Sequence, residues 1–357
     1  MARPTHALID TAALQNNLQR VKSCAPTQRV MAVIKANAYN HGAIKVANAL
    51  ESNVDAFAVC CLEEALELRE VGIKKPIVLL EGAFHLDELP VIVHQDLQIV
   101  IAMPKQLEQL VKAKLEKPIH VWLKVDTGMH RLGFSPNDIE AIYKFLKQNQ
   151  QVENVNLMSH LACADDRQDK MTEQQTEIFN QLVQSLNIEE SSLANSAGIL
   201  GWPQTHADWV RPGIMLYGAS PFVNSVAIDE GLQPVMQLQS ALISVKRLRK
   251  GEAIGYGATW HSPQNMPVGV VAIGYADGYP RKAPSGTPVL VNGRRVPLIG
   301  RVSMDMITVD LRTQPNARIG DPVVLWGKNL PVEEIASLAD TIAYELLCNV
   351  GSRVERF

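Results

Sequence analysis

The chain lacks several features that would assign it to the membrane or to nucleic acid. It has no run of about 18 apolar residues, the length that a membrane-spanning helix needs. Its first residues, Met1–His6, carry no apolar core of a signal peptide. Its net charge is −3, so there is no basic excess of the kind that nucleic acid or an anionic membrane attracts. We expect a cytoplasmic protein that binds neither nucleic acid nor membrane.

Cysteine is scarce. The chain has 5 cysteines, an odd number, and none of their spacings matches a metal site. Reduced thiols are expected, as in a reducing compartment, and we expect no metal. The residues concerned are Cys24, Cys60, Cys61, Cys163 and Cys348.

The first two-thirds of the chain alternates short apolar runs with amphipathic stretches. Helices are expected at Cys61–Gly72 and at Met171–Leu186, the second with Thr172 and Gln175 as a capping box. About eight strand–helix units in roughly 220 residues predict a closed (β/α)8 barrel of the TIM type, with an open doubly wound sheet as the alternative. No Gly-x-Gly-x-x-Gly turn supports a dinucleotide-binding version of that alternative. The expected strands are Met31–Lys35, Ala56–Cys60, Pro76–Glu81, Leu97–Ala102, Ile119–Val125, Val155–His160, Ser191–Asn195 and Trp209–Arg211.

After about residue 230 the pattern becomes mostly β. The segment Val289–Val296 contains Asn292-Gly293, a strong signal for a hairpin turn between two strands. A short helix is expected at Val332–Ala339, before the apolar segment Ile342–Leu347. We therefore expect a barrel domain at residues 1–229 and a C-terminal β domain at residues 230–357. Its other expected strands are Ala241–Val245, Val268–Ile273, Met306–Leu311 and Pro322–Trp326.

Lys35 is the least expected residue of the barrel strands. It follows the apolar residues Ala32–Ile34, and burying an unpaired ammonium is costly. Desolvation also lowers the pKa of an amine, which a lysine needs to form a Schiff base near neutral pH. The alternative is a lysine whose stem covers apolar surface while its head stays in water.

Other polar residues fall at the same expected edge. Because barrel active sites form at the C-terminal ends of the strands, we expect one site there. Taken singly, His160 fits a structural histidine, Asn195-Ser196 a helix cap and Arg211 a surface ion pair. The turns Asn195–Gly198 and Arg211–Ile214 also resemble phosphate-binding turns. Phosphate beside a Schiff-base lysine indicates pyridoxal 5′-phosphate (PLP). The residues at this edge are Lys35, Arg131, His160, Asn195, Ser196 and Arg211.

A series of motifs, in order along essentially the whole chain, resembles the alanine racemase family. One departure is Asn40, which stands where the family's lysine motif usually has glycine; asparagine tolerates the left-handed conformation. The resemblance implies a PLP-dependent enzyme that interconverts L- and D-alanine. The motifs are Ala32–Gly42, Lys124–Gly133, Arg211–Gly218, Gly255–Gly257, Gly274–Tyr279 and Gly300–Asp305.

The resemblance also implies a role for each catalytic residue. Lys35 would hold PLP and act as one base, and Tyr256 would act as the second base on the opposite face. In the family this tyrosine comes from the partner chain of a head-to-tail homodimer, so each active site is shared. His160 and Arg211 would form a relay that favours the tyrosine phenolate, and Arg211 would face the pyridine nitrogen of PLP.

Binding roles follow in the same way. Arg131 would contact the phenolic oxygen of PLP and the substrate carboxylate, and Met304 of the partner chain would give that carboxylate a backbone N–H. Lys124 matches a lysine that is carbamylated in many members; a plain pair with Asp126 is the alternative. The phosphate contacts would be Tyr39, Ser196, Gly213, Ile214 and Tyr344, with Asn195 nearby. The corridor through which substrate reaches the site would be lined by Tyr275, Arg281, Arg301 and Asp305.

Other readings of the sequence remain open. A non-catalytic PLP-binding barrel protein would lack residues 230–357 with Tyr256. A PLP-dependent decarboxylase of similar architecture would use a cysteine in another motif. A racemase of broader specificity would share these motifs, as would both a biosynthetic enzyme that supplies D-alanine for peptidoglycan and a catabolic one.

Overall fold

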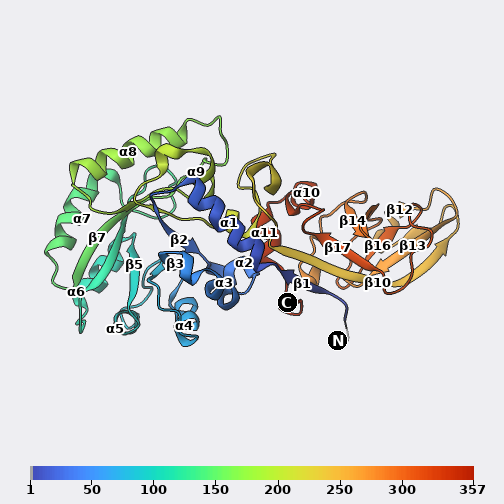
Figure 1. The fold of residues 1–357 in the computed structure, drawn as a ribbon, viewed down its shortest axis with the longest axis horizontal. Coiled ribbons are helices and arrows are strands. Elements are labelled where there is room, and N and C mark those ends of the chain that lie inside the picture. The colour runs from blue at the N-terminus through green and yellow to red at the C-terminus, as the bar shows by residue number, and fades with distance from the viewer. Residues whose placement is uncertain (1–2) are drawn as a thin grey trace.

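The computed structural model describes residues 3–357, in which two bodies of different architecture lie end to end (Figure 1). One is a strand–helix barrel and the other is a mostly β body. Buried apolar side chains form one continuous cluster that runs from the barrel, at Val33, into the sheet, at Leu238 and Val289. No helix within residues 3–357 is both long and apolar enough to cross a membrane.

The barrel is closed, as the sequence predicts, and the open-sheet alternative is wrong. Neighbouring strands pair in parallel, and β2 pairs with β9 to complete the ring. The strands are apolar on both faces because helices cover them; every residue of β3 is buried. The barrel strands are β2 (Arg29–Val33), β3 (Ala56–Val59), β4 (Ile77–Leu79), β5 (Leu97–Ile101), β6 (Ile119–Lys124), β7 (Val152–Met158), β8 (Ser191–Ser192) and β9 (Trp209–Val210).

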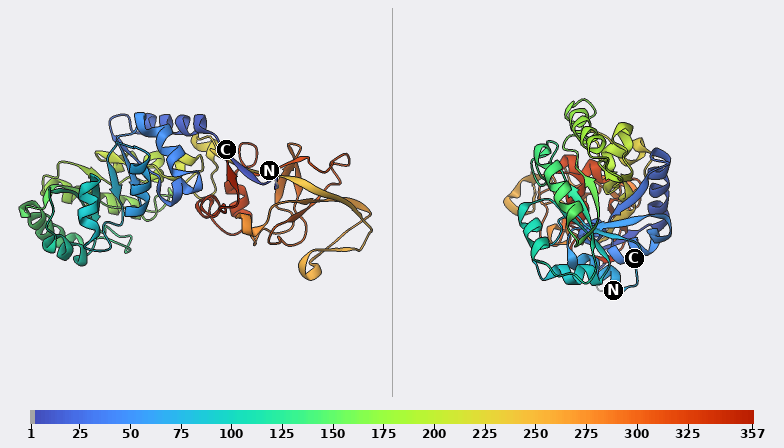
Figure 2. Two further views of the ribbon diagram at one scale, coloured as in Figure 1. Left: turned by 90° about the horizontal axis from the view of Figure 1, so that it is seen from below. Right: turned by 90° about the vertical axis from the view of Figure 1, so that its left-hand side faces the viewer.

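The helices of this body pack around the ring (Figure 2). Its helices are α1 (Thr11–Cys24), α2 (Lys35–Asn40), α3 (Ala43–Leu50), α4 (Leu62–Glu70), α5 (Glu88–His94), α6 (Pro104–Lys112), α7 (Pro136–Gln148), α8 (Met171–Ser185) and α9 (Ser196–Gly201). Several strands end earlier than expected, so Lys35 and His160 lie just beyond their strands and not within them. Lys35 is therefore the first residue of α2, and His160 is carried by a loop of the rim.

The capping box expected in α8 is wrong. The N-cap of this helix is Lys170, whose side chain makes no capping hydrogen bond, and the Met171 N–H donates to Asp169 Oδ1 at 2.7 Å instead. Gln175 is fully buried and faces the barrel loops: its Oε1 accepts from the Ala162 N–H at 2.8 Å, and its Nε2 donates to the His160 carbonyl at 3.0 Å. Gln175 thus supports the loop that carries His160.

The second body is built on a long strand, β10 (Met236–Leu248). The main sheet has the order β15-β14-β17-β10-β1-β18, and β13 and β16 extend it from β10. Asn292 and Gly293 both have positive φ, 49° and 74°, as the predicted hairpin turn requires. The remaining elements are β11 (Ala253–Ile254), β12 (Trp260–His261), β13 (Met266–Val271), β14 (Pro288–Val291), β15 (Arg294–Pro297), β16 (Ile307–Asp310), β17 (Pro322–Trp326), β18 (Glu355–Arg356), α10 (Val332–Leu338) and α11 (Ala343–Cys348).

The N-terminal strand β1 (His6–Ile9) lies in this sheet and not in the barrel. It pairs antiparallel with β10 and parallel with β18, so the first and last strands of the structure lie side by side (Figure 1). We keep the division of the chain at residues 229 and 230 as a proposal, with β1 as a strand that crosses it.

Candidate active site

Lys35 opens a segment of unusual backbone shape. Each residue from Ala36 to Asn40 is left-handed, with φ between 50° and 63°. A left-handed conformation costs a residue with a side chain about 1–2 kcal/mol. The surrounding structure must therefore hold this segment in place.

The left-handed segment is held in place by Glu64 and by a stack of aromatic rings. Glu64 Oε1 accepts from the Ala36 N–H at 2.6 Å. The Tyr39 ring stacks on Tyr217 with centroids 4.6 Å apart, and the Tyr217 hydroxyl donates to the Val33 carbonyl at 2.9 Å. Tyr39 is thereby fixed against the end of β2.

His41 lies beneath the same segment. It is fully buried, its ring lies 4.6 Å from that of Tyr217, and its Nδ1 donates to the carbonyls of Ala38 and Tyr39 at 3.0 and 2.9 Å. Burial lowers its pKa to about 4, so the ring is neutral at pH 7. His41 is a structural support of the segment.

A small polar cradle lies beside Tyr39. The Ser196 hydroxyl accepts from the Gly213 N–H at 2.9 Å and from the Met215 N–H at 3.3 Å. A Cβ on Gly213 would come within 2.5 Å of the Tyr39 hydroxyl, so only glycine leaves room for that contact. Burial raises the pKa of Tyr39, which keeps its hydroxyl protonated and able to donate.

Two further predicted phosphate residues frame this cradle. Ile214 begins the short 3-10 helix Ile214–Tyr217 directly after Gly213, and Tyr344 of α11 lies with its ring centroid 6.1 Å from that of Tyr39. Asn195 is the N-cap of α9, with its Oδ1 accepting from the Gly198 N–H at 3.0 Å. The capping alternative for Asn195 is thus the one that its side-chain hydrogen bond supports.

Arg211 is buried and its terminal nitrogens are hydrogen-bonded inside the barrel, so the surface ion-pair alternative is wrong. Its side chain donates to the Ser192 hydroxyl at 2.5 Å, to the Leu193 carbonyl at 3.2 Å and to the Ser159 carbonyl. Its Nη2 lies 3.4 Å from His160 Nδ1. Burial lowers the pKa of Arg211 to about 10, which leaves it a cation at pH 7.

His160 and Lys124 share this positive environment. Burial, and then the charges of Arg211, Lys124, Arg131 and Lys35, hold the pKa of His160 well below its usual range. Burial and the neighbouring cations lower the pKa of Lys124 to about 8. Lys124, Arg131 and His160 also line one small cavity. The structure brings these predicted residues together at one rim.

Asp126 does not pair with Lys124 anywhere in the described part of the chain. Its Oδ1 accepts from the N–H groups of Gly128 and His130, each at 3.0 Å, and its Oδ2 faces the His130 ring. The alternative of a plain Lys124–Asp126 pair is therefore wrong.

The remaining predicted residues lie on the second body, exposed and apart from the rim. Tyr256 lies between β11 and β12 and is 68% exposed, and β12 lies in the part of the second body that is remote from the barrel (Figure 1). Met304 is 52% exposed, and the Tyr275 N–H next to it donates to the Ser303 carbonyl. Within one chain, Tyr256 is not brought to Lys35.

The proposed corridor residues lie on this same body. Arg301 lies close enough to Gly257 for a Cβ there to meet its guanidinium at 3.2 Å, so it neighbours Tyr256. Asp305 pairs with Arg353, and Arg281 is exposed. They form part of an exposed polar surface.

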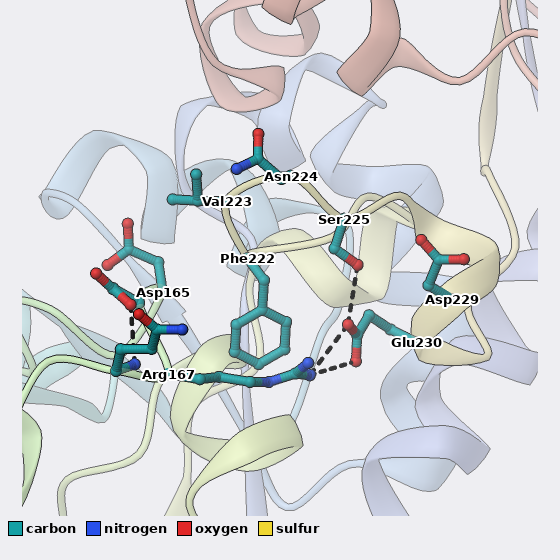
Figure 3. Close-up of a pocket in the computed structure, with 10 residues that line it drawn as sticks. Asp165, Arg167, Phe222, Val223, Asn224, Ser225, Asp229 and Glu230 are labelled. Atoms are coloured by element: carbon teal, nitrogen blue, oxygen red, sulfur yellow. Dashed lines mark hydrogen bonds and ion pairs between the residues drawn. The ribbon is translucent and has the colours of Figure 1, made fainter.

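A larger cavity, of about 680 Å³, lies beside the rim (Figure 3). Arg167 lies over the Phe222 ring at 3.8 Å and pairs with Glu230 at 3.0 Å, and Asp165 points into the same space. The rest of its charged lining is acidic, with Asp166 and Asp229. Such a lining repels the carboxylate of an amino acid, so this cavity is not the anion site.

Several supporting residues escaped the sequence reasoning. Glu64 and Gln175 are ordinary helix residues by pattern, and their contacts join segments far apart in the chain. Ser159 and Leu193 hold Arg211 through backbone carbonyls, which any residue type supplies. Ser192 Oγ is the exception, since a serine inside a barrel strand is a signal of its own.

Known proteins match the chain from end to end. The model of the alanine racemase N-terminal domain matches residues 9–221, and that of the C-terminal domain matches residues 235–357. An alanine racemase of Vibrio cholerae is 52% identical over 98% of this chain and 96% of its own length. The biosynthetic alanine racemase of Escherichia coli is also 52% identical, over 97% of each chain.

Solved structures agree with these matches. The crystal structure of the biosynthetic alanine racemase from Pseudomonas aeruginosa superposes with a TM-score of 0.97, at 49% identity over 99% of each chain. The alanine racemase of Acinetobacter baumannii has a TM-score of 0.93 at 40% identity, again over 99% of each chain. Both bodies of the structure described above are present in these relatives. The chain belongs to the alanine racemase family.

Proposed function

We propose that this chain is an isomerase that interconverts L- and D-alanine, with PLP held at Lys35. The observation that carries the proposal is the convergence, at one barrel rim, of an amine on a strained segment, an N–H and hydroxyl cradle, and a buried arginine. The family membership supports the reaction, and the rim supports the cofactor.

The residues present fit PLP. Its phosphate needs donors without much surrounding bulk, and the cradle offers Ser196, Gly213 and the protonated Tyr39 hydroxyl where a Cβ would intrude. Its carbonyl carbon needs an amine, which Lys35 provides. Its ring nitrogen would face Arg211, whose guanidinium keeps its proton in proteins. Ile214, Tyr344 and Arg131 complete the proposed contacts, with Asn195 nearby.

When bound, the cofactor supplies an electron sink for charge that develops at the α-carbon of alanine. Arg211 would face the ring nitrogen and donate a hydrogen bond to it without surrendering a proton. Its role would be to keep that nitrogen unprotonated, which would favour return of the proton to the α-carbon over transamination.

Inverting the α-carbon requires a base on each face. We assign one to Lys35 and the other to Tyr256 of the partner subunit, because the Tyr256 of the same chain lies close to β12, which is remote from the barrel (Figure 1). Tyr256 is 68% exposed, so its hydroxyl is accessible to a second copy of the chain. The proposal therefore includes a head-to-tail homodimer with two shared sites.

His160 prepares that second base. Arg211 Nη2 can only donate, so His160 Nδ1 accepts from it and the ring proton sits on Nε2. That N–H would be able to donate a hydrogen bond to the oxygen of the tyrosine and so stabilise a negative charge on it. His160 has its pKa held low, so it stays neutral and acts as a donor of a hydrogen bond without itself becoming an acid.

The substrate carboxylate is assigned to Arg131 and to the backbone N–H of Met304 of the partner subunit. We propose that Lys124 is carbamylated: a lysine of pKa about 8 has enough free amine near neutral pH to add to CO2, with release of one proton. The resulting carboxylate would balance the cations around it and orient Arg131. Tyr275, Arg281, Arg301 and Asp305 remain the proposed substrate corridor.

A biosynthetic role, in which the enzyme supplies D-alanine for peptidoglycan in the cytoplasm, is the role we favour. Relatives from Escherichia coli and Pseudomonas aeruginosa carry the word biosynthetic in their names. The C-terminal body speaks against a non-catalytic PLP-binding barrel protein, which would lack it. A broader substrate range is an outcome of the assay below.

The test is a visible spectrum of the purified protein before and after borohydride, followed by peptide mapping. We expect an absorbance band that is lost on reduction, with the label on Lys35. A D-amino-acid oxidase assay should then detect D-alanine formed from L-alanine, and other L-amino acids tested in parallel define the substrate range. A colourless protein that gains no band with added PLP would refute the proposed cofactor.

A further inference from the structure

The C-terminal strand reaches back to the lysine segment. Arg356, in β18, donates from Nε to the Asn40 carbonyl at 2.7 Å and from Nη2 to Asn40 Oδ1 at 2.6 Å. Asn40 in turn donates from Nδ2 to the Cys348 carbonyl at 3.0 Å and to the Val350 carbonyl. One residue at the end of the left-handed run is thus held through its backbone and its side chain.

Asn40 is the residue at which this sequence departs from the motif of its family. Its φ is 63°, a value that glycine adopts without cost and that asparagine tolerates. Glycine would have no side chain to bond to Arg356, Cys348 or Val350. The departure therefore adds contacts without changing the backbone shape.

Arg356 acts here as a clamp and not as a counter-charge. Nη2 also donates to the Val350 carbonyl and Nη1 to the Val354 carbonyl, both at 2.9 Å. Across residues 3–357 its guanidinium makes no ion pair with a carboxylate. All its hydrogen bonds go to carbonyl and amide oxygens, so they fix the relative position of two backbones.

The strand that carries Arg356 is itself anchored. β18 pairs in parallel with β1, the Phe357 N–H donates to the Ala7 carbonyl, and the Ile9 N–H donates to the Phe357 carbonyl, each at 2.9 Å. The central sheet thus provides a fixed support on one side of the clamp. The strained segment, which carries Lys35 and Tyr39, lies on the other.

We propose that Arg356 and Asn40 are positioning residues, which lock the left-handed segment so that Lys35 and Tyr39 are preorganised for the cofactor. The backbone part of this inference stands on the contacts alone, and its consequence for PLP rests on the proposed function of Lys35. The clamp makes the cofactor site dependent on the last residues of the chain.

The first test is Arg356→Met in the full-length protein, with amide hydrogen exchange followed by mass spectrometry. Losing charged hydrogen bonds should raise exchange of residues 36–42 by about tenfold or more, because local opening becomes easier. Arg353→Met is the matched control: it lies on the same tail and pairs with Asp277 and Asp305 instead. The control should leave exchange of residues 36–42 unchanged.

The second variant, Asn40→Gly, keeps the backbone shape and removes only the side-chain bonds. We expect a smaller rise in exchange, and a double variant with Arg356→Met that rises by less than the product of the two single effects. A PLP titration followed by absorbance should show about tenfold weaker binding in Arg356→Met. The variants should rank by loss of PLP affinity in the same order as they rank by exchange rate.

Unchanged exchange in both variants, with the thermal melting point retained, would overturn the clamp. Faster exchange with unchanged PLP affinity would overturn the preorganisation while leaving the clamp intact. A wild-type protein that binds no PLP would refute the proposed function and leave the exchange result standing, so the two failures are distinguishable.

Discussion

The barrel rim and the exposed face of the second body carry the proposed catalytic residues in opposite ways. At the rim, Arg211 and His160 are enclosed, hydrogen-bonded and shifted in pKa by their neighbours. On the second body, Tyr256 and Met304 stand in solvent. In the proposed dimer, one half of the site is preorganised within the chain, and the other half would gain its surroundings only from the partner subunit. The difference between the two bodies is therefore the feature that the proposed shared site has to explain.

The largest expected effect tests that difference directly. Tyr256→Phe and Lys35→Ala should each lower kcat by about a thousandfold or more, because each removes one base. A mixture of the two variants, unfolded and refolded together, should recover about a quarter of wild-type activity, since half of the dimers then hold one intact site. Activity is followed with D-amino-acid oxidase.

The control for this mixture is each variant refolded alone. If both bases came from one chain, no mixing could create an intact site, and the mixture would stay as inactive as its parts. That result would refute the shared site and with it the contrast between the two bodies.

The next effect concerns the buried His41 of the barrel and the dependence of stability on pH. The pKa of His41 is lowered from 6.5 in the unfolded chain to about 4 in the folded one. Between these two pKa values, His41 binds more protons in the unfolded chain than in the folded one. The neutral ring's contribution to the free energy of unfolding is therefore complete above pH 6.5 and is lost as the pH falls toward 4. The loss is about 3 kcal/mol.

His41→Gln should flatten this part of the curve of unfolding free energy against pH. Denaturant unfolding at a series of pH values from about 4 to 7 measures it. His160, whose pKa is also held low, contributes in the same direction, so His160→Gln is the matched comparison. A pH slope that is unaltered in His41→Gln would contradict the neutral buried ring.

A smaller effect is expected at the cradle. Gly213→Ala puts a Cβ within 2.5 Å of the Tyr39 hydroxyl, so the tyrosine must move and the affinity for PLP should fall by about tenfold. Titration with PLP, followed by absorbance, measures this. Gly293→Ala is the control for loss of a glycine: it strains the hairpin turn, where φ is 74°, but its Cβ would meet nothing within 4 Å, so it should lower stability and leave PLP affinity unchanged. Equal affinities in both variants would argue against this cradle as the phosphate site.

The smallest expected effect is a change in the ratio of products. Arg211→Glu places a group at the ring nitrogen that is able to protonate it, so transamination per racemisation turnover should rise by severalfold. Pyridoxamine phosphate is quantified by chromatography against turnover. A ratio no higher than in the wild type would contradict the assigned position of Arg211.

The sequence predicted the barrel well because buried parallel strands read as short apolar runs, whatever packs against them. It predicted the hairpin at Asn292-Gly293 because the turn itself demands those residues. The capping box in α8 failed because Gln175, a good N3 residue by pattern, is drawn to the loop of His160 instead. The spacing of residues within a helix does not predict hydrogen bonds to segments that are distant in the sequence.

The candidate site shows the same division. Lys35, His160 and Arg211 were recognised because a charged or titratable residue at a strand end is unexpected. The left-handed run from Ala36 to Asn40 was foreseen only at Asn40, because alanine and tyrosine give no sign of positive φ. Glu64 and Tyr217 support the left-handed segment, and no spacing in the sequence predicts that they do so.

The place of β1 in the second sheet has a consequence for how the protein is made. β1 is synthesised before the barrel, yet its partners β10 and β18 both follow the barrel along the chain. The barrel strands can pair as they emerge, while β1 waits with both edges unpaired, a state prone to wrong association. The finished enzyme therefore depends on an order of assembly in which β1 is made before the barrel and pairs only after it.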